Sequence, residues 1–250
     1  MVTGKRAATV ILLHGAGGTG AYWGLVRPRL QAAGHRTLAP DLPNHPGATF
    51  ADQAAAVVAL VGALADARPV VLVAQSMGAY AAVLAADRVD TVRLVLLNAM
   101  VPAPGESAAD WWEATGQPEA RRAAEVAAGR DPDAPLDLET VFLHDVPPAG
   151  RAFLEGDGVP ADSLFVDPFP LAGWPEVATT VVSSRGDRLF PVAFQQGVAR
   201  ARLGIEPVVL PGGHLVALSH PEAVLRCLSL SQIALPEPAT LTEPVEGQNA

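Results

Sequence analysis

A serine at the tip of a predicted strand-to-helix turn is the side chain best placed for nucleophilic chemistry. Residues 70–74 form an apolar run that predicts a strand, and residues 77–86 predict a helix. Ser76 lies between them in the pattern small-x-Ser-x-Gly, with Ala74 at the first position, where glycine is usual. Such a turn exposes a serine hydroxyl above a sheet, and the helix N-terminus behind it favours a developing oxyanion. Because Ser-x-Gly is also typical of a simple helix cap, the interpretation depends on partners elsewhere in the chain.

A serine nucleophile needs a base, and His214 is the predicted one. It follows two glycines directly after the predicted strand at residues 207–210. A glycine turn there can present an imidazole at the edge of a sheet. His220 is the alternative, but the surrounding Ser-x-x-Glu sequence resembles a capping box and predicts that His220 lies in the first turn of a helix.

Asp187 is the predicted acid that orients the imidazole. It follows the predicted strand at residues 177–184. The carboxyl ends of parallel strands are where such sheets present functional side chains. An Asx turn or an ion pair with a neighbouring arginine is the alternative. The chain order Ser76, Asp187, His214 matches the order serine, acid, histidine of one class of fold. The agreement of three separately placed residues is stronger than any single motif.

Short runs rich in Val, Ile and Leu alternate with helical stretches along the chain, and this alternation predicts an α/β fold. The predicted strands are residues 7–13, 35–40, 70–74, 92–98, 177–184 and 207–210. The predicted helices are residues 21–33, 51–65, 77–86, 191–202 and 221–230. Nearly continuous apolar strands separated by helices indicate a mostly parallel central sheet that helices cover on both faces.

The alternation stops over residues 101–174, which predict a separate cap, or lid. This stretch holds ten of the 23 prolines and is too long for a plain loop. Helical pieces are expected at residues 118–128 and 148–154. The expected core therefore comprises residues 1–100 and 175–235, and the acidic residues 236–250 are expected to form a disordered tail.

Composition narrows the classes of partner. The chain has 250 residues, of which 50% are hydrophobic and 17% charged, and its net charge is −9. This content is too apolar for disorder, and an acidic chain without a basic block is a poor binder of nucleic acid. The single cysteine, Cys227, excludes an internal disulfide and a cysteine-cluster metal site. No pair of histidines has the spacing of metal ligands, so we expect no metal.

Two apolar segments partly resemble targeting or membrane signals. Residues 7–13 follow Lys5 and Arg6, but His14 stands where a signal peptide would have its small-residue cleavage site. The longest uncharged window, residues 69–86, is interrupted by polar residues and glycine in its middle. We therefore expect a cytoplasmic protein that does not act at a membrane.

Several of these motifs together resemble the α/β-hydrolase fold. They are His14-Gly15 after the first strand, the turn at Ser76, Asp187 and Gly213-His214. Residues 20–23, 33–35 and 39–42 further resemble the branch of plant methylesterases and hydroxynitrile lyases and their bacterial relatives. The resemblance spans residues 10–230, most loosely in the cap. It implies a helical cap inserted after the sixth strand.

The oxyanion hole is expected to use two backbone N–H groups. One belongs to Met77, the residue after the nucleophile. The resemblance implies that Ala16 supplies the other.

The reaction expected within this branch is ester hydrolysis. The lyases carry a threonine close to the first-motif histidine and a lysine in the cap, whereas this chain has Gly15 directly after His14 and its only lysine at Lys5. Epoxide and haloalkane hydrolases of this fold use a carboxylate nucleophile, which Ser76 disfavours.

A competing signal overlaps the first loop. Gly15, Gly17 and Gly20 spell the G-x-G-x-x-G pattern of a dinucleotide-binding fold, and Asp41 follows 21 residues after the last glycine. A dehydrogenase has no need of the turn at Ser76 or of a Gly-Gly-His turn, so we expect no cofactor.

The overall prediction is a serine hydrolase that cleaves a small, largely apolar carboxylic ester or lactone through an acyl-enzyme on Ser76. Aromatic side chains beneath the cap are candidates for an apolar pocket, although each is equally suited to the core. The candidate substrate-binding residues are Gly15, Trp23, Trp111, Trp112, Phe142 and Phe165. Two alternatives remain: a type II thioesterase that acts on acyl-carrier thioesters, and a non-catalytic small-molecule receptor with the same fold.

Overall fold

The computed structural model describes residues 7–66 and 69–228, and the predicted tail at residues 236–250 lies outside them. One six-stranded sheet forms the centre of the fold, with strand order β2-β1-β3-β4-β5-β6. All pairings between its strands are parallel. The strands are β1 (Thr9–Leu13), β2 (Arg36–Leu38), β3 (Val70–Gln75), β4 (Thr91–Leu97), β5 (Thr179–Ser184) and β6 (Val208–Leu210). The predicted parallel sheet is therefore confirmed.

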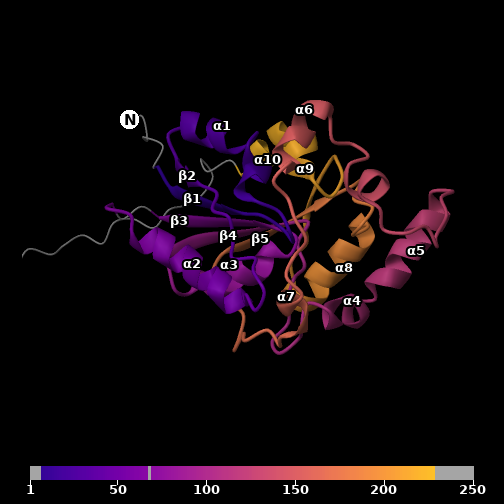
Figure 1. Ribbon diagram of the computed structural model, residues 1–250, viewed down its shortest axis with the longest axis horizontal. Helices are drawn as coiled ribbons and strands as arrows, with labels where there is room; N and C mark the ends of the chain where they lie inside the picture. Colours follow the sequence, from indigo (N-terminus) through magenta and orange to yellow (C-terminus); the bar gives the residue numbers. More distant parts are fainter. Residues whose placement is uncertain (1–6, 67–68, 229–250) are drawn as a thin grey trace, which may run out of the picture.

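Helices cover both faces of this sheet, as Figure 1 shows. Alternate residues of β3 face opposite sides: Leu72 packs into a cluster with α2 and α3, and Val71 packs into a cluster with α1 and α10. The helices of the core are η1 (Gly20–Trp23), α1 (Arg27–Ala32), α2 (Phe50–Gly62), α3 (Gly78–Ala86), α8 (Val192–Leu203), α9 (Val216–Ser219) and α10 (Pro221–Cys227). In the described part of the chain, no helix is long and apolar enough to cross a membrane.

The single helix expected at residues 21–33 is instead two helices. A short 3-10 helix, η1, ends at Trp23, and α1 begins at Arg27 with Pro28 in its first turn. Proline lacks an N–H and restricts the residue before it, so it fits the start of a helix and not its middle. The break lets η1 turn back over the edge of the sheet beside α9.

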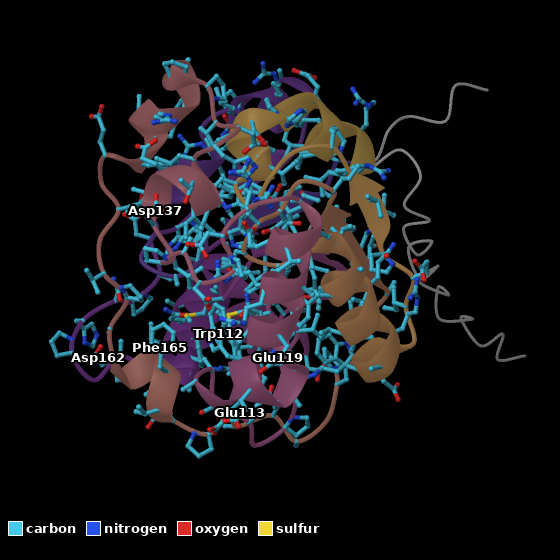
Figure 2. The ribbon with its side chains drawn as sticks, turned by 90° about the vertical axis from the view of Figure 1, so that its right-hand side faces the viewer. Trp112, Glu113, Glu119, Asp137, Asp162 and Phe165 are labelled. Atoms are coloured by element: carbon cyan, nitrogen blue, oxygen red, sulfur yellow. The ribbon has the colours of Figure 1, made fainter. Side chains whose placement is uncertain are left out.

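A cap segment, residues 101–174, lies between β4 and β5 and consists of short helices. They are α4 (Asp110–Thr115), α5 (Gln117–Ala127), the π-helix η2 (Leu138–Phe142), α6 (Pro148–Arg151), η3 (Ala152–Leu154) and α7 (Ser163–Val166). The segment follows the fourth strand of the described chain, and not the sixth as the resemblance implied. In the described chain only the four strands β1 to β4 precede residue 101. Figure 2 looks onto this segment.

Two glycines let the loop after β1 touch the turn after β3. A Cβ atom on Gly78 would lie 2.4 Å from the carbonyl oxygen of His14, and a Cβ atom on Gly15 would lie 2.4 Å from Oε1 of Gln75 and 3.0 Å from Cβ of Ser76. No larger residue fits either place without movement of a neighbour. Because the contact at Gly78 is to backbone, that neighbour cannot swing aside as a flexible side chain would.

This contact predicts that Gly78→Ala destabilises the fold. Overpacking of this kind costs on the order of 1–3 kcal/mol in the free energy of unfolding. Gly197→Ala is the matched control, because Gly197 lies inside α8 and a Cβ atom there meets no atom within 4 Å. The control should gain roughly 0.5–1 kcal/mol, since alanine is the better helix former. Urea unfolding of both variants measures the difference, and equal stability of the two would contradict this account of the turn.

Candidate active site

The three side chains predicted to act together do meet. Nε2 of His214 lies 3.1 Å from Oγ of Ser76, and Nδ1 of His214 lies 2.8 Å from Oδ2 of Asp187. Each residue follows the carboxyl end of a different strand, β3, β5 or β6, and each is buried. Parallel strands end at one edge of their sheet, so side chains 138 residues apart converge there.

Ser76 has a strained backbone. Its φ is +52°, a left-handed conformation that is uncommon for residues other than glycine. The ends of neighbouring strands hold it there: the N–H of Ser76 donates to the carbonyl of Leu97 at 3.1 Å, and its carbonyl accepts from Met100 and Ala79 at 3.2 Å. Conformations of this kind cost about 1–3 kcal/mol and persist only where surrounding bonds impose them. The strained turn is what the small-x-Ser-x-Gly pattern predicted.

The carboxylate of Asp187 is fixed by four donors. Oδ1 accepts from the backbone N–H groups of Leu189 and Phe190 at 2.9 and 2.8 Å, and Oδ2 accepts from Nε2 of Gln195 at 3.2 Å as well as from His214. One oxygen thus makes the contacts of an Asx turn and the other bonds to the imidazole, while the orienting role of Asp187 stays a prediction. Gln195 is a contact that the sequence analysis missed.

The imidazole of His214 is held along its edges and at its backbone. The rings of Phe142 and Phe190 meet it edge to face, with centroids 5.5 and 5.1 Å away. Nδ2 of Asn98 donates to the carbonyl of His214 at 3.0 Å. With Nδ1 bonded to a carboxylate, the proton of a neutral imidazole resides on Nδ1 and leaves Nε2 as the acceptor facing Ser76.

His220 lies apart from this arrangement. It is the N-cap residue of α10, and its Nδ1 is 3.0 Å from Oγ of Ser219. Its position at the start of a helix was predicted correctly, but the predicted capping box is wrong: Ser219 ends α9 and makes no cap bond, and Glu222 pairs with Arg29. The helix begins one residue later because proline at position 221 supplies its first turn.

The two predicted oxyanion donors lie on either side of the contact between the loop after β1 and the turn after β3. Ala16 and Met77 both border the same cavity as Ser76. Within the described residues, neither backbone N–H donates to a protein acceptor. Their assignment as the oxyanion hole stays a prediction, and these free donors support it.

His14 fixes the loop that carries Ala16. Nδ1 of His14 is 2.8 Å from the carbonyl oxygen of Gly15, and Nε2 accepts the N–H of Leu42 at 3.0 Å. Burial lowers the pKa of His14, so the ring is neutral near pH 7 and can accept at Nε2. The residue therefore braces the loop and takes no part in the Ser76 hydrogen-bond chain.

A cavity of about 730 Å³ opens between the cap segment and the candidate catalytic residues. Gly15, Phe142 and Phe165 line it, as predicted, together with Trp112. Figure 2 labels Trp112, on α4, and Phe165, on α7, both within the cap segment. Further apolar residues that no sequence motif marks also line it, among them Tyr22, Met100, Leu136, Leu138, Leu143, Leu154, Leu189, Phe190 and Leu215.

Two predicted lining residues are instead core. Trp23 is fully buried beside Tyr22, and it is Tyr22 that reaches the cavity. Trp111 is fully buried, with its Nε1 donating to the carbonyl of Val101 at 3.0 Å. In each adjacent pair of aromatic residues one ring fills the core and its neighbour borders the cavity, a choice that residue type alone cannot indicate.

Charged side chains gather where the cap segment borders the cavity. Glu155 and Asp157 lie there, with burial raising the pKa of Asp157 above its ordinary value. Arg151 is the single cation among the described lining residues, and its guanidinium donates to Glu139 at 2.8 and 3.1 Å. This rim is therefore net acidic.

The dinucleotide-like pattern is explained by packing. The N–H of Gly20 donates to Oδ1 of Asp41 at 2.7 Å, and a Cβ atom on Gly20 would lie 2.1 Å from the carbonyl oxygen of Ala39. The glycine and the carboxylate thus join the first loop to the end of β2. Over residues 7–66 and 69–228, no group of three His, Cys, Asp or Glu side chains is arranged to hold a metal ion.

Comparison with known proteins agrees with this geometry. A curated relative, the pyrethroid hydrolase of Sphingobium wenxiniae, is 28% identical over 248 residues, which cover 88% of this chain and 86% of that protein. The solved structure of polyneuridine aldehyde esterase is 20% identical, with a TM-score of 0.71, and the match covers 90% of this chain and 98% of that one. A pyrethroid hydrolase from Sphingobium faniae JZ-2 is 23% identical, with a TM-score of 0.67 and coverage of 90% and 96%.

The sequence model of the alpha/beta hydrolase family matches residues 10–226. That span runs from β1 to α10 and includes the strand ends that carry Ser76, Asp187 and His214. The chain therefore belongs to the alpha/beta hydrolase family.

Proposed function

We propose that this hydrolase cleaves carboxylic esters through an acyl-enzyme on Ser76. The observation that carries the proposal is the hydrogen-bonded series from Oγ of Ser76 through His214 to Asp187, which borders an apolar cavity. Esterase relatives of the same family support it.

In the acylation step, Nε2 of His214 takes the proton of Ser76 while Oγ bonds to the ester carbonyl carbon. The carbonyl oxygen becomes an oxyanion, which accepts from the N–H groups of Ala16 and Met77. Collapse of this intermediate breaks the bond to the alcohol, which leaves with the proton from His214. Asp187 stabilises the imidazolium while it exists.

Deacylation repeats the sequence with water. His214 takes a proton from water, whose oxygen bonds to the acyl carbon, and the returned proton restores the hydroxyl of Ser76. The products are the carboxylic acid and the free enzyme. The bonds that fix Asp187 and His214 serve both halves, because the imidazole must act first as a base and then as an acid in each.

The lining of the cavity defines the class of ester that we propose. A volume of about 730 Å³ is within the usual range for drug-sized ligands. The sequence prediction of a small, largely apolar ester or lactone therefore extends to larger apolar esters. Two relatives are named for pyrethroid hydrolysis, so a pyrethroid ester is a reasonable member of a substrate panel.

The acidic rim disfavours the thioesterase alternative. Acyl-carrier thioesters bear phosphate groups, and a chain of net charge −9 with Arg151 already paired to Glu139 offers them little attraction. The receptor alternative is disfavoured by the strain retained at Ser76, which a protein that only binds ligand does not need.

Ser76→Ala should abolish hydrolysis of p-nitrophenyl acetate while the protein stays folded, because it removes the hydroxyl that bonds to His214 and forms the acyl-enzyme in this mechanism. The rate of nitrophenolate release measures it, with circular dichroism as the check on folding. Turnover within about tenfold of the unmodified protein, a loss of only ~1.4 kcal/mol in activation free energy, would defeat the mechanism.

Asp187→Asn should lower kcat by roughly 10³–10⁴-fold, since an amide that donates to Nδ1 would leave the proton on Nε2, where it blocks the base. Gln196→Ala is a control on α8, the helix that follows Asp187, because its amide donates to the exposed Glu206 and not to the carboxylate of Asp187. Steady-state kinetics of both variants test the role of the carboxylate. A loss of less than tenfold for Asp187→Asn would assign that residue to the Asx turn alone.

Neutral oxygen esters should be cleaved with a higher kcat/KM than either their analogues carrying a carboxylate or the matching acyl-carrier thioesters. The physical reason is repulsion between the acidic rim and an anionic substrate, which added salt screens. The measurement is kcat/KM for a matched series at two ionic strengths. A preference for the anionic thioester would instead support the thioesterase.

A further inference from the structure

One carboxylate of the cap segment reaches the backbone beside the catalytic histidine. Asp145 lies between η2 and α6, and its Oδ2 accepts the backbone N–H of Gly213 at 2.6 Å. Gly213 directly precedes His214. A hydrogen bond to an ionised acceptor is shorter and stronger than one between neutral groups. The cap is thus tied to the loop that carries the base.

The two segments also fit closely in shape. A Cβ atom on Gly213 would lie 2.7 Å from Oδ1 of Asp145 and 2.7 Å from Cε1 of His144. Asp145 therefore occupies the space that any other residue at position 213 would fill. This contact favours glycine at the second position of the Gly-Gly-His sequence, whereas the left-handed φ of the turn, +96°, belongs to Gly212.

The core holds the same short segment from below. Nδ2 of Asn98 donates to the carbonyl oxygens of Gly213 at 3.1 Å and His214 at 3.0 Å. Asn98 has a φ of +45° and also bonds to Ser184 at 2.9 Å. The peptide groups beside the imidazole are fixed on their carbonyl side by the core and on their N–H side by Asp145.

Other partners do not explain the carboxylate. Nε2 of His144 lies 4.0 Å from Oδ1, and Nδ1 of His220 lies 3.8 Å from Oδ2, both beyond hydrogen-bond distance. Oδ1 has no hydrogen-bond partner among the described residues. The bond to Gly213 is therefore the one that gives this largely buried acid its orientation.

We propose that Asp145 is a positioning residue for His214, and this inference rests on the proposed esterase function. Its carboxylate holds the Gly213 peptide so that Nε2 of His214 stays in line with Oγ of Ser76. A displacement of about 1 Å between reacting groups can cost on the order of a hundredfold in rate. In this arrangement the docked cap is part of the machinery that aligns the base.

The test compares variants that remove or keep the acceptor. Asp145→Ala and Asp145→Leu both remove it, the second with little change in volume, and Asp145→Asn keeps an oxygen for the N–H. Ser163→Ala is the matched control, because it removes a different bond between cap and core, from Oγ of Ser163 to the carbonyl of Ala48 at 2.8 Å. The readouts are the rate at which a fluorophosphonate labels Ser76, kcat and KM for p-nitrophenyl acetate, and the melting temperature.

Removal of the acceptor should slow labelling and lower kcat by about tenfold or more with KM unchanged, by the same positional argument. Asp145→Asn should restore most of the rate, and Ser163→Ala should match the unmodified protein. Labelling of Asp145→Leu at the control rate would overturn the proposal. So would a loss of folding in both acceptor-free variants, which would make Asp145 a support of the fold instead. Failure of the unmodified protein to label at Ser76 would count against the esterase function, and not against the contact.

Discussion

The hydrogen bond between Nε2 of His214 and Oγ of Ser76, at 3.1 Å, is the interaction on which the proposed chemistry depends. A serine hydroxyl without this bond is a weak nucleophile, and an imidazole without its orienting carboxylate can turn away from the serine. The parallel sheet makes the bond possible, since it ends β3, β5 and β6 at one edge. The packing around that edge holds the loops after these three strands in place.

Tight packing keeps them there. Gly15 and Gly78 allow the first loop to touch the turn at Ser76, and their neighbours Ala16 and Met77 present free N–H groups beside the nucleophile. Asn98 ties the end of β4 to the histidine loop. The strained backbone of Ser76 is held by its own hydrogen bonds to Leu97, Met100 and Ala79. The cap segment adds Asp145 from the opposite side.

The sequence predicted the sheet and indicated three side chains that the structure brings together, because both depend on local patterns. Apolar runs mark buried strands, and Ser76, Asp187 and His214 each follow such a run next to glycine or a small residue. Prediction failed where the outcome depends on three-dimensional packing. Trp23 and Trp111 are aromatic and adjacent in sequence to the lining residues Tyr22 and Trp112, yet they fill the core. Gln195 lies eight residues from Asp187 and Asp145 lies 68 residues from Gly213, and no spacing rule links either pair. Asp41 matched a dinucleotide pattern because a loop that packs closely needs the same glycines as a loop that binds phosphate.

The most direct measurement of the central claim is mass spectrometry of the protein quenched in acid while it turns over a p-nitrophenyl ester. An acyl-enzyme mechanism predicts a mass increase of one acyl group, located by proteolysis to the peptide that contains Ser76. Hydrolysis with the acyl group on another residue would contradict the account. So would hydrolysis in which the Ser76 peptide carries no acyl group in either the wild-type protein or the Asp187→Asn variant.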